Sequence, residues 1–471
     1  MKKKQIFTLE EGQGETVFIR SHLGKYLAVD IDGAFTAHHD EAGVDCGFII
    51  QAQPNGQWAI ASAEHGFYLG GSGENLRAFV KEISGDRLWT VNLAHHPMVT
   101  IKNIKRTTFV HLADDGQKLT CDEVIPWGED AVLSLIFNEN GTYSIQAPNG
   151  AFLSRTGALH QDNSSSETHF VLEIHGGKVT FKSVDDNMYL TALGAQGLLK
   201  ATKRCADFSQ ISDNEKFELQ NSYPQITLQA ANGKFVSTKQ GVELAAKEAS
   251  SDTDKEIFQM EPLGGDQFRL KIHNSNYVRS GASAEHSAED GVHASDTDIS
   301  SDQTTYTVEF VGEAGVNSIA FKASNGKYLQ QQMNGYLKAK ADEASADAKS
   351  TFIFSIVNRP RIAFRSSIGF LQTMGSGLIE VNKSTPDVYM LESKGGRFAV
   401  LAENGKYWTV GENGNTSATG DSAQYFYVEL KQNSKLAIRT ESGKYLKIDA
   451  GGGFLVANGG DGESADCQFE Y

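Results

Sequence analysis

Gly443-Lys444-Tyr445-Leu446 is one copy of a short motif that recurs along the chain and decides its fold. The same order of residues, a turn glycine or asparagine followed by an aromatic and an apolar residue, stands at Gly24-Lys25-Tyr26-Leu27 and Gly326-Lys327-Tyr328-Leu329. All copies together, some of them weaker, place the aromatic residue at Tyr26, Tyr68, Phe109, Phe152, Tyr189, Phe235, Tyr277, Tyr328, Phe370, Tyr407 and Tyr445. Their mean spacing of about 42 residues indicates a repeat architecture.

The residues between the copies have the pattern of short strands joined by tight turns. In Phe268-Arg269-Leu270-Lys271-Ile272-His273 apolar residues alternate with polar ones, as in a strand with one buried face. Asn55-Gly56 and Asn140-Gly141 stand before similar runs, and this dipeptide is a strong hairpin signal because both residues tolerate positive φ. With 47 glycines and only 8 prolines, the composition also favours many turns. The pattern predicts an all-β chain.

Two all-β folds have a repeat of this length, the propeller blade and the lobe of a β-trefoil. Propellers have about four to eight blades, which eleven copies do not fit, and the tryptophan-aspartate blade signature is absent. Grouped in threes from the C-terminus, the copies form three complete trefoils and a first one with two lobes. We therefore predict four tandem β-trefoils, the first incomplete at its N-terminus, with strand edges and apolar core exposed there.

The grouping places domains at residues 1–97, 98–222, 223–358 and 359–471. A proline stands near each join, at Pro97, Pro224 and Pro360, and proline cannot continue a sheet ladder. The joins are too short for flexible linkers, so we expect packed trefoils. Ser280 to Ser301 is rich in polar and acidic residues and is predicted to be a solvated loop; the spacing of a calcium loop is missing from it.

Charge and motif content exclude several functions. Lys and Arg total 43 against 59 Asp and Glu, and a net charge of -16 argues against nucleic-acid or membrane partners. No apolar run approaches the roughly 18 residues of a membrane span, and we see no secretion signal. The four cysteines have no metal-site spacing, and hydrolase, zinc-protease and phosphate-loop motifs are absent. We expect no enzyme activity and no cofactor.

Longer motifs resemble a known family. Arg20-Ser21-His22-Leu23-Gly24-Lys25-Tyr26-Leu27-Ala28, Pro126-Trp127-Gly128, Asn358-Arg359-Pro360 and Gly405-Lys406-Tyr407-Trp408-Thr409-Val410-Gly411 are specific in sequence and in order. Through them the chain resembles fascin, an actin-bundling protein of four tandem β-trefoils, over essentially all of its 471 residues. The resemblance implies a cytoplasmic monomer that cross-links parallel actin filaments in filopodia and similar protrusions, without nucleotide or metal.

The resemblance also implies contact residues. In fascins a principal actin site lies where the first and fourth trefoils meet, and the matching positions here are Lys2, Lys3, Lys4, Arg359, Arg365, Lys447 and Glu470. Arg106 matches another proposed surface, on the second trefoil. Further basic clusters contain Lys102 and Lys105; Lys200, Lys203 and Arg204; Arg361; and Lys435, Arg439 and Lys444. A solvated face that only maintains solubility explains each cluster equally well. Ser367-Ile368 and Thr373-Met374 replace charged pairs of the familiar fascins.

A trefoil lectin is the alternative from another class. Trp58, Trp89, Trp127 and Trp408 could stack on sugars, as aromatic residues do in trefoils that bind carbohydrate. The Gln-x-Trp signature of that class is absent, and aromatic residues at repeat positions are more often part of the core. Retention on a glycan column together with loss of actin binding would favour the lectin.

Overall fold

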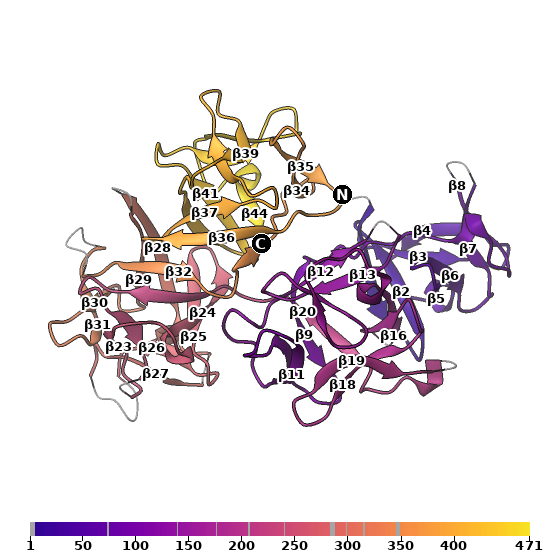
Figure 1. Ribbon diagram of the computed structural model, residues 1–471, viewed down its shortest axis with the longest axis horizontal. Coiled ribbons are helices and arrows are strands. Elements are labelled where there is room, and N and C mark those ends of the chain that lie inside the picture. The colour runs from indigo at the N-terminus through magenta and orange to yellow at the C-terminus, as the bar shows by residue number, and fades with distance from the viewer. Residues whose placement is uncertain are drawn as a thin grey trace. The chain divides into compact units, whose positions relative to one another are not determined.

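A computed structural model describes residues 5–72, 75–138, 140–175, 177–205, 208–239, 241–282, 288–297, 299–313, 316–344 and 349–471. Within these ranges the chain forms strands and short 3-10 turns and no α-helix. It divides into two compact units, unit 1 with residues 1–126 and 130–221, and unit 2 with residues 127–129 and 222–471. In Figure 1 unit 1 runs from indigo to magenta and unit 2 from pink to yellow.

Unit 1 contains two antiparallel sheets. The first has eight strands in the order β4-β3-β2-β5-β6-β7-β8, with β1 on β2: β1 (Phe7–Glu11), β2 (Thr16–Ser21), β3 (Tyr26–Val29), β4 (Phe35–His39), β5 (Gly47–Ala52), β6 (Trp58–Ser62), β7 (Tyr68–Ser72) and β8 (Asn75–Val80). The second has twelve strands: β9 (Met98–Asn103), β10 (Phe109–Leu112), β11 (Leu119–Glu123), β12 (Leu133–Phe137), β13 (Tyr143–Gln146), β14 (Phe152–Leu153), β15 (Leu159–His160), β16 (Phe170–His175), β17 (Lys178–Ser183), β18 (Tyr189–Leu193), β19 (Leu198–Lys203) and β20 (Phe217–Gln220).

Unit 2 contains the remaining strands. One sheet has twelve: β21 (Gln225–Gln229), β22 (Phe235–Ser237), β23 (Ala245–Glu248), β24 (Ile257–Gly264), β25 (Gln267–Lys271), β26 (Tyr277–Ser280), β27 (Val292–Asp296), β28 (Tyr306–Glu313), β29 (Val316–Lys322), β30 (Tyr328–Gln331), β31 (Leu337–Ala341) and β32 (Phe352–Ile356). Three smaller sheets contain β33 (Arg361–Ile362), β34 (Phe370–Thr373), β35 (Ile379–Lys383), β36 (Tyr389–Lys394), β37 (Arg397–Leu401), β38 (Tyr407–Val410), β39 (Thr416–Gly420), β40 (Tyr427–Lys431), β41 (Lys435–Arg439), β42 (Tyr445–Ile448), β43 (Leu455–Gly459) and β44 (Gln468–Glu470).

Short 3-10 turns separate some of the strands. They are η2 (Val44–Cys46), η3 (Gly85–Arg87), η4 (Ser166–Thr168), η5 (Phe208–Gln210), η6 (Asp254–Glu256), η7 (Asp302–Thr304) and η8 (Ala465–Cys467). In η6 the first turn is closed by a capping box, in which Thr253 and Glu256 satisfy each other's backbone N–H groups.

The repeated motif forms a tight turn followed by the start of a strand, as predicted. Each of the eleven motif aromatics is the first residue of a strand. In ten of the eleven copies the residue two positions before the aromatic has a positive φ, between 58° and 88°. This residue is a glycine in most copies, as at Gly443 (φ 83°), and it is Thr107 (φ 60°) or Ser275 (φ 71°) in two weaker ones. Glycine adopts this left-handed backbone without steric cost, so the motif ends one strand and starts the next at a fixed place.

A polar contact that the sequence did not suggest recurs with the motif. Tyr445 donates its hydroxyl to Glu429, and Tyr189 donates to Glu173, both at 2.7 Å. The same bond joins four other pairs: Tyr26 with Glu10, Tyr277 with Glu261, Tyr328 with Glu309 and Tyr407 with Glu392. Each glutamate precedes its tyrosine by 15 to 19 residues, on the strand before the one that pairs with the motif. The bond therefore fixes successive strands of one lobe to each other.

Backbone hydrogen bonds join the hairpins of the three lobes of a trefoil around an approximate threefold axis. In residues 359–471 three backbone bonds close a ring: Val381 N–H to Gly453 O at 3.1 Å, Ala418 N–H to Gly377 O at 2.7 Å, and Ala457 N–H to Gly414 O at 2.7 Å. Residues 223–358 repeat the ring with Ala246, Ala294 and Ala339 as donors. These rings are what a trefoil of three lobes requires, and the prediction of an all-β chain of tandem β-trefoils is confirmed. The exact boundaries between the trefoils stay a prediction.

The first sheet exposes part of its apolar surface. Phe79 and Leu76, both on β8 at one end of the sheet, are 50% and 44% exposed, and Phe7 on β1 is 46% exposed. One bond of the ring type links its two motif copies, from Ala78 N–H to Gly33 O at 3.2 Å. Apolar side chains at this edge of the sheet are therefore partly in contact with solvent.

Trefoils three and four share one apolar core. A single cluster of buried side chains extends from Ile226 to Tyr471. At the contact, Gly396 has φ 74°, and a Cβ there would lie 2.0 Å from Asn317 O. Only glycine permits this approach of two backbones, so the packed arrangement depends on that position.

The predicted loop at Ser280 to Ser301 needs a correction. Val292–Asp296 forms β27, which pairs with β26 (Arg279↔His293), and Val292, His293 and Ala294 are buried. The sequence prediction failed there because the apolar residues of this short strand are small or isolated among polar ones. Residues 283–287 and 298 lie outside the described part of the chain.

Candidate functional site

The expected contact residues fall in three parts of the chain. Outside the described residues lie Lys2, Lys3 and Lys4. Unit 1 contains Arg106. Unit 2 contains Arg359, Arg365, Lys447 and Glu470. The last four come from the start and the end of the fourth trefoil, and the structure brings Arg365 and Glu470 into direct contact.

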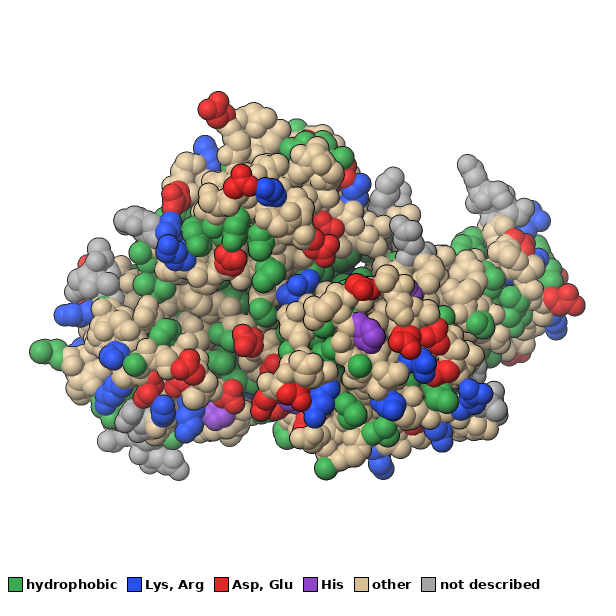
Figure 2. Space-filling model, in the orientation of Figure 1, with side chains coloured by type: hydrophobic (Ala, Val, Ile, Leu, Met, Phe, Trp, Pro, Cys, Tyr) green, Lys and Arg blue, Asp and Glu red, His purple; other side chains and the backbone are tan. Residues whose placement is uncertain are grey.

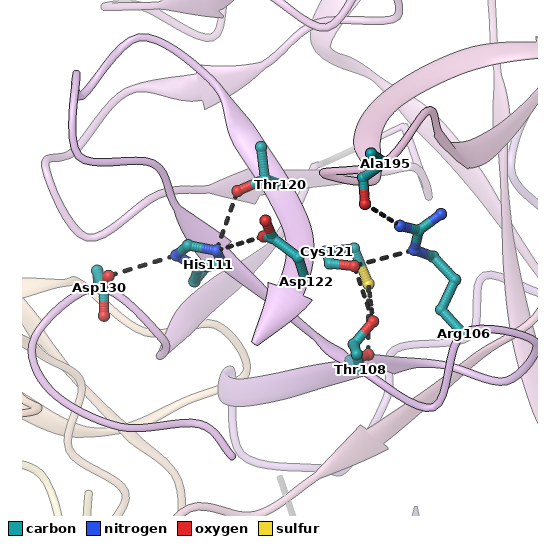
Figure 3. Close-up of polar contacts among 8 residues, drawn as sticks. All are labelled: Arg106, Thr108, His111, Thr120, Cys121, Asp122, Asp130 and Ala195. Carbon is teal, nitrogen blue, oxygen red and sulfur yellow. Dashed lines mark hydrogen bonds and ion pairs between the residues drawn. The ribbon is translucent and has the colours of Figure 1, made fainter. Parts of the chain in front are cut away.

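The guanidinium of Arg106 is hydrogen-bonded to the turn at Gly194 and Ala195. The Nε group donates to Cys121 O at 3.1 Å and Nη2 to Ala195 O at 2.5 Å (Figure 3). Nη1 donates to Gly194 O at 3.0 Å. Three backbone carbonyls therefore occupy its three nitrogen atoms. A guanidinium bound in this way fixes a loop, while its neighbour Lys105 remains exposed.

The turn held by Arg106 leads into β19. Gly197 in this turn has φ 66°, and a Cβ there would lie 2.6 Å from Cys121 O and 2.9 Å from Arg106 Nε. β19 carries Lys200 and Lys203, which belong to a basic cluster separate from Arg106 in sequence. Arg106 thus connects two sequence clusters in one part of trefoil two, a link that no sequence pattern revealed.

His111 on β10 is a buried cation that sequence analysis missed. Its Nε2 lies 2.8 Å from Asp122 Oδ1 and 3.0 Å from Thr120 Oγ1, and its Nδ1 lies 3.4 Å from Asp130 Oδ2 (Figure 3). Burial by itself lowers the pKa of His111, but the hydrogen bonds to Asp130 and Asp122 raise it more, to about 9. His111 is therefore protonated at neutral pH and ties together both ends of the segment from Asp122 to Asp130.

We expect the stabilising contacts of His111 with Asp122 and Asp130 to weaken at alkaline pH. The pKa of His111 is raised above its ordinary 6.5, so its contribution to stability is complete below pH 6.5 and is lost as the pH rises through about 9. Between pH 7 and pH 10 the free energy of unfolding should fall by about 2 kcal/mol more in the wild type than in His111→Gln. Urea unfolding of both proteins at the two pH values measures this, and a constant difference between them would contradict the assignment.

Arg359 is buried, with 1% of its surface exposed. Its Nη2 donates to Ser222 Oγ at 2.6 Å and to Ser222 O at 3.2 Å, and its Nη1 donates to Asn358 O at 3.1 Å. The guanidinium carbon lies 5.6 Å from the ring centroid of Tyr471. In this structure the side chain is therefore enclosed by its own unit and offers no surface to an external partner.

Arg365 and Glu470 form a half-exposed ion pair. Arg365 Nε donates to Glu470 Oε2 at 2.6 Å, and the two backbones exchange bonds of 2.9 and 2.8 Å. β44, which ends at Glu470, pairs with β41 so that Glu470 is opposite Lys435. The C-terminal strand thus brings Glu470 together with Arg365 and Lys435, which belong to two separate basic clusters of the sequence.

Three lysines on β41, β42 and the turn between them have no carboxylate within 4.0 Å in the described part of the chain: Lys435, Lys444 and Lys447. Lys444 is exposed, and Lys435 and Lys447 are half-buried. In contrast, the motif lysine of three other copies binds an aspartate 15 residues later: Lys25 binds Asp40, Lys327 binds Asp342 and Lys406 binds Asp421. This Lys-Asp spacing is a sequence signal that could have separated neutralised from available lysines.

The fourth trefoil is nearly neutral within an acidic chain. Residues 359–471 hold 12 Lys and Arg against 13 Asp and Glu, so they contribute -1 to the net charge of -16. Figure 2 shows basic and acidic side chains interspersed over the visible face, without one large basic patch. An acidic partner must therefore be met by small groups of lysines that lack a carboxylate neighbour.

The described residues offer neither a metal site nor a membrane-spanning helix. No group of three or more His, Cys, Asp or Glu side chains is placed to hold a metal ion there. No helix in the same part of the chain is long and apolar enough to cross a membrane.

Comparison with known proteins gives consistent matches along the sequence. A model of the Fascin domain matches residues 1–91, 99–219, 231–387 and 370–471. The chain is 34% identical over 482 residues to Fascin-2 of Mus musculus, covering 100% of this chain and 92% of that protein. It is 33% identical to Fascin-2 of Homo sapiens with the same coverage, and 28% identical to Fascin of Strongylocentrotus purpuratus, of which it covers 93%.

Proposed function

Because this chain belongs to the fascin family, we propose that it binds actin filaments and cross-links them into tight parallel bundles through at least two basic surfaces. The observation that carries the proposal is the match of the Fascin domain to four consecutive stretches of the chain. Bundling requires two binding surfaces on a stiff body, because a flexible tether would join filaments at irregular distances. Tandem trefoils with a shared core supply such a body within unit 2.

The proposed contact residues have two different roles. Lys447 and Glu470 lie on the strands β42 and β44, and Lys2, Lys3 and Lys4 are included on the family resemblance. Arg365 presents Glu470 through its ion pair. Arg106 and Arg359, whose guanidinium groups are bound by backbone carbonyls, are positioning residues in this proposal. The chain's own contacts thus separate groups that can meet a filament from groups that support them.

The family membership also supports the remaining parts of the proposal. The protein acts as a cytoplasmic monomer in filopodia and other actin-rich protrusions, has no enzymatic activity, and uses neither nucleotide nor metal. Actin's surface is acidic, so attraction must come from local lysines such as those of β41 and β42.

Sedimentation with filamentous actin at two speeds tests this function. We expect actin to pellet at low speed with the protein, which shows bundling, and the yield to fall as salt rises because the contacts are between charges. Pelleting of the protein with actin at high speed only would show one competent surface and contradict bundling. A protein that stays in the supernatant at both speeds would refute actin binding.

A further inference from the structure

The turn between β1 and β2 meets the end of β16 within unit 1. Glu15 belongs to this turn, and its Oε2 lies 3.3 Å from Nδ1 of His175, the last residue of β16. Leu9 on β1 and Ile50 on β5 pack against the apolar clusters of both sheets of unit 1. The contact between Glu15 and His175 therefore lies where these two sheets pack together.

His175 lies between two carboxylates. Its Nε2 is 3.3 Å from Oε2 of Glu173 on the same strand, and its Nδ1 faces Glu15. The side chains of His175 and Glu173 are 3% and 4% exposed, whereas that of Glu15 is 49% exposed. We name Glu15, His175 and Glu173 the histidine clasp. It joins a solvated carboxylate next to the first sheet to a buried carboxylate of the second.

The buried carboxylate of the clasp is ionised at neutral pH. Tyr189 on β18 donates its hydroxyl to Oε2 of Glu173 at 2.7 Å, and Lys182 Nζ on β17 lies 3.7 Å from Oε1. Burial by itself raises the pKa of Glu173, but the hydrogen bonds from His175 and Tyr189 lower it more. The titratable and charged groups on the elements around His175 include Glu11 and Glu15 of the β1–β2 hairpin, Glu173 on β16, Lys178 and Lys182 on β17, Tyr189 on β18 and Glu218 on β20, and β5 carries none.

Only a protonated ring can donate to both carboxylates. An imidazolium has an N–H on each ring nitrogen, whereas a neutral imidazole has one N–H and one lone pair. Glu173 is buried, so the loss of its histidine donor is costly, while Glu15 can exchange that donor for water. The single N–H of a neutral ring therefore stays with Glu173. The lone pair on Nδ1 then faces Glu15, and this carboxylate turns to solvent.

We propose that the histidine clasp is a proton-operated anchor for the β1–β2 hairpin. With His175 protonated, the clasp fastens the hairpin to the end of β16. With His175 neutral, the hairpin is released at Glu15. Histidine side chains change charge between about pH 5 and 8, so the anchor responds to acidification near neutral pH.

The anchor also bears on proposed contact residues at the start of the chain. β1 begins shortly after Lys2, Lys3 and Lys4, which the proposed function includes as filament contacts. A fastened hairpin fixes the point at which this lysine segment joins the fold, so less freedom is lost when a filament binds. We therefore expect a lower pH to favour bundling. This consequence rests on the proposed function, whereas the clasp is a property of the free protein.

Nitrogen-15 NMR of the histidine rings and hydrogen exchange test the clasp in the free protein at pH 6 and pH 8. The ring signals of His175 are those missing from His175→Gln, or those shifted in Glu15→Gln if the first variant does not fold. We expect protons on both ring nitrogens at pH 6 and on one at pH 8. Protection factors in β1 and β2 should be about threefold higher at pH 6. His111, with its pKa raised to about 9, stays protonated at both values and does not cause this difference.

Glu15→Gln removes the solvated carboxylate and keeps its size. At both pH values, protection of β1 and β2 in this variant should match that of the wild type at pH 8, within about 1.5-fold. Glu64→Gln is the matched control, because Glu64 is an exposed glutamate in the turn between β6 and β7 of the same sheet. It makes the same change in charge and should keep the wild-type response to pH.

The outcomes separate the clasp from the proposed function. Equal protection of β1 and β2 at both pH values in the wild type, or a wild-type response in Glu15→Gln, would overturn the clasp. In low-speed sedimentation with actin, the wild type should bundle about twofold more than Glu15→Gln at pH 6 and equally at pH 8. Equal bundling at both values would overturn the role of the clasp in bundling. If the wild type binds no actin, the proposed function fails, and the NMR and exchange measurements still decide the clasp.

Discussion

Replacing Lys435, Lys444 and Lys447 together with glutamate is expected to abolish low-speed pelleting of actin and to weaken filament binding at least about 100-fold. None of these lysines has a carboxylate within 4.0 Å in the described structure, so their charge is available to a partner. Reversing them places like charges against an acidic surface, which costs several kcal/mol where the contact excludes water. High-speed sedimentation across a range of protein concentrations measures the affinity.

A matched control carries the same change in net charge. The variant with Lys25, Lys327 and Lys406 replaced by glutamate alters three lysines that already bind Asp40, Asp342 and Asp421. Exposed pairs of this kind contribute about 0 to 1 kcal/mol each, so this variant should fold and should keep most of its affinity. If both variants lose affinity equally, net charge and not the β41–β42 surface controls binding.

Replacing Trp408 with alanine should destabilise unit 2 by about 3 to 5 kcal/mol. Trp408 is 0% exposed and lies 5.4 Å from the ring of Phe364 and 5.0 Å from that of Tyr389, between centroids. Its removal leaves a cavity at the centre of trefoil four that these large neighbours cannot fill. Urea unfolding monitored by hydrogen exchange measures the loss, and protection should fall first in residues 359–471.

Met390→Ala is the control in the same trefoil. Met390 is 46% exposed, so its replacement should change the free energy of unfolding by less than about 0.5 kcal/mol. Because trefoils three and four share a core, Trp408→Ala should also weaken protection in residues 223–358. Equal effects of the two variants would show that the fourth trefoil tolerates a cavity at its centre.

The repeat itself was readable from the sequence because it rests on local rules. Ten of the eleven copies have a residue with positive φ and, two positions later, an aromatic residue. Together they end one strand and start the next within four positions. Tyr26, Phe235 and Tyr445 all begin strands as predicted. Alternation of apolar and polar residues then sets the buried face of each strand. The predicted loop from Ser280 to Ser301 was wrong at Val292–Asp296, because that strand has too few large apolar residues to show the alternation.

The partners of the charged residues depended on tertiary structure. Arg106, Arg359 and Lys444 look alike in sequence, as basic residues next to turns or prolines. Folding gives Arg106 three carbonyls and buries Arg359 against Tyr471. It leaves Lys444 exposed, with no carboxylate neighbour among the residues that the structure describes. Their ligands are up to 137 residues away, as between Arg359 and Ser222, so no local pattern encodes them.

The sequence by itself determined the trefoil lobes, because turn conformation and strand alternation depend on neighbouring residues. Only the tertiary structure decided which cations can meet a partner and which support the fold, because that depends on burial and on carbonyls and carboxylates supplied by distant strands. Tyr445 and Glu470 illustrate the two cases: Tyr445 begins a strand as the repeat predicts, whereas the pairing of Glu470 with Arg365 follows from closure of the fourth trefoil.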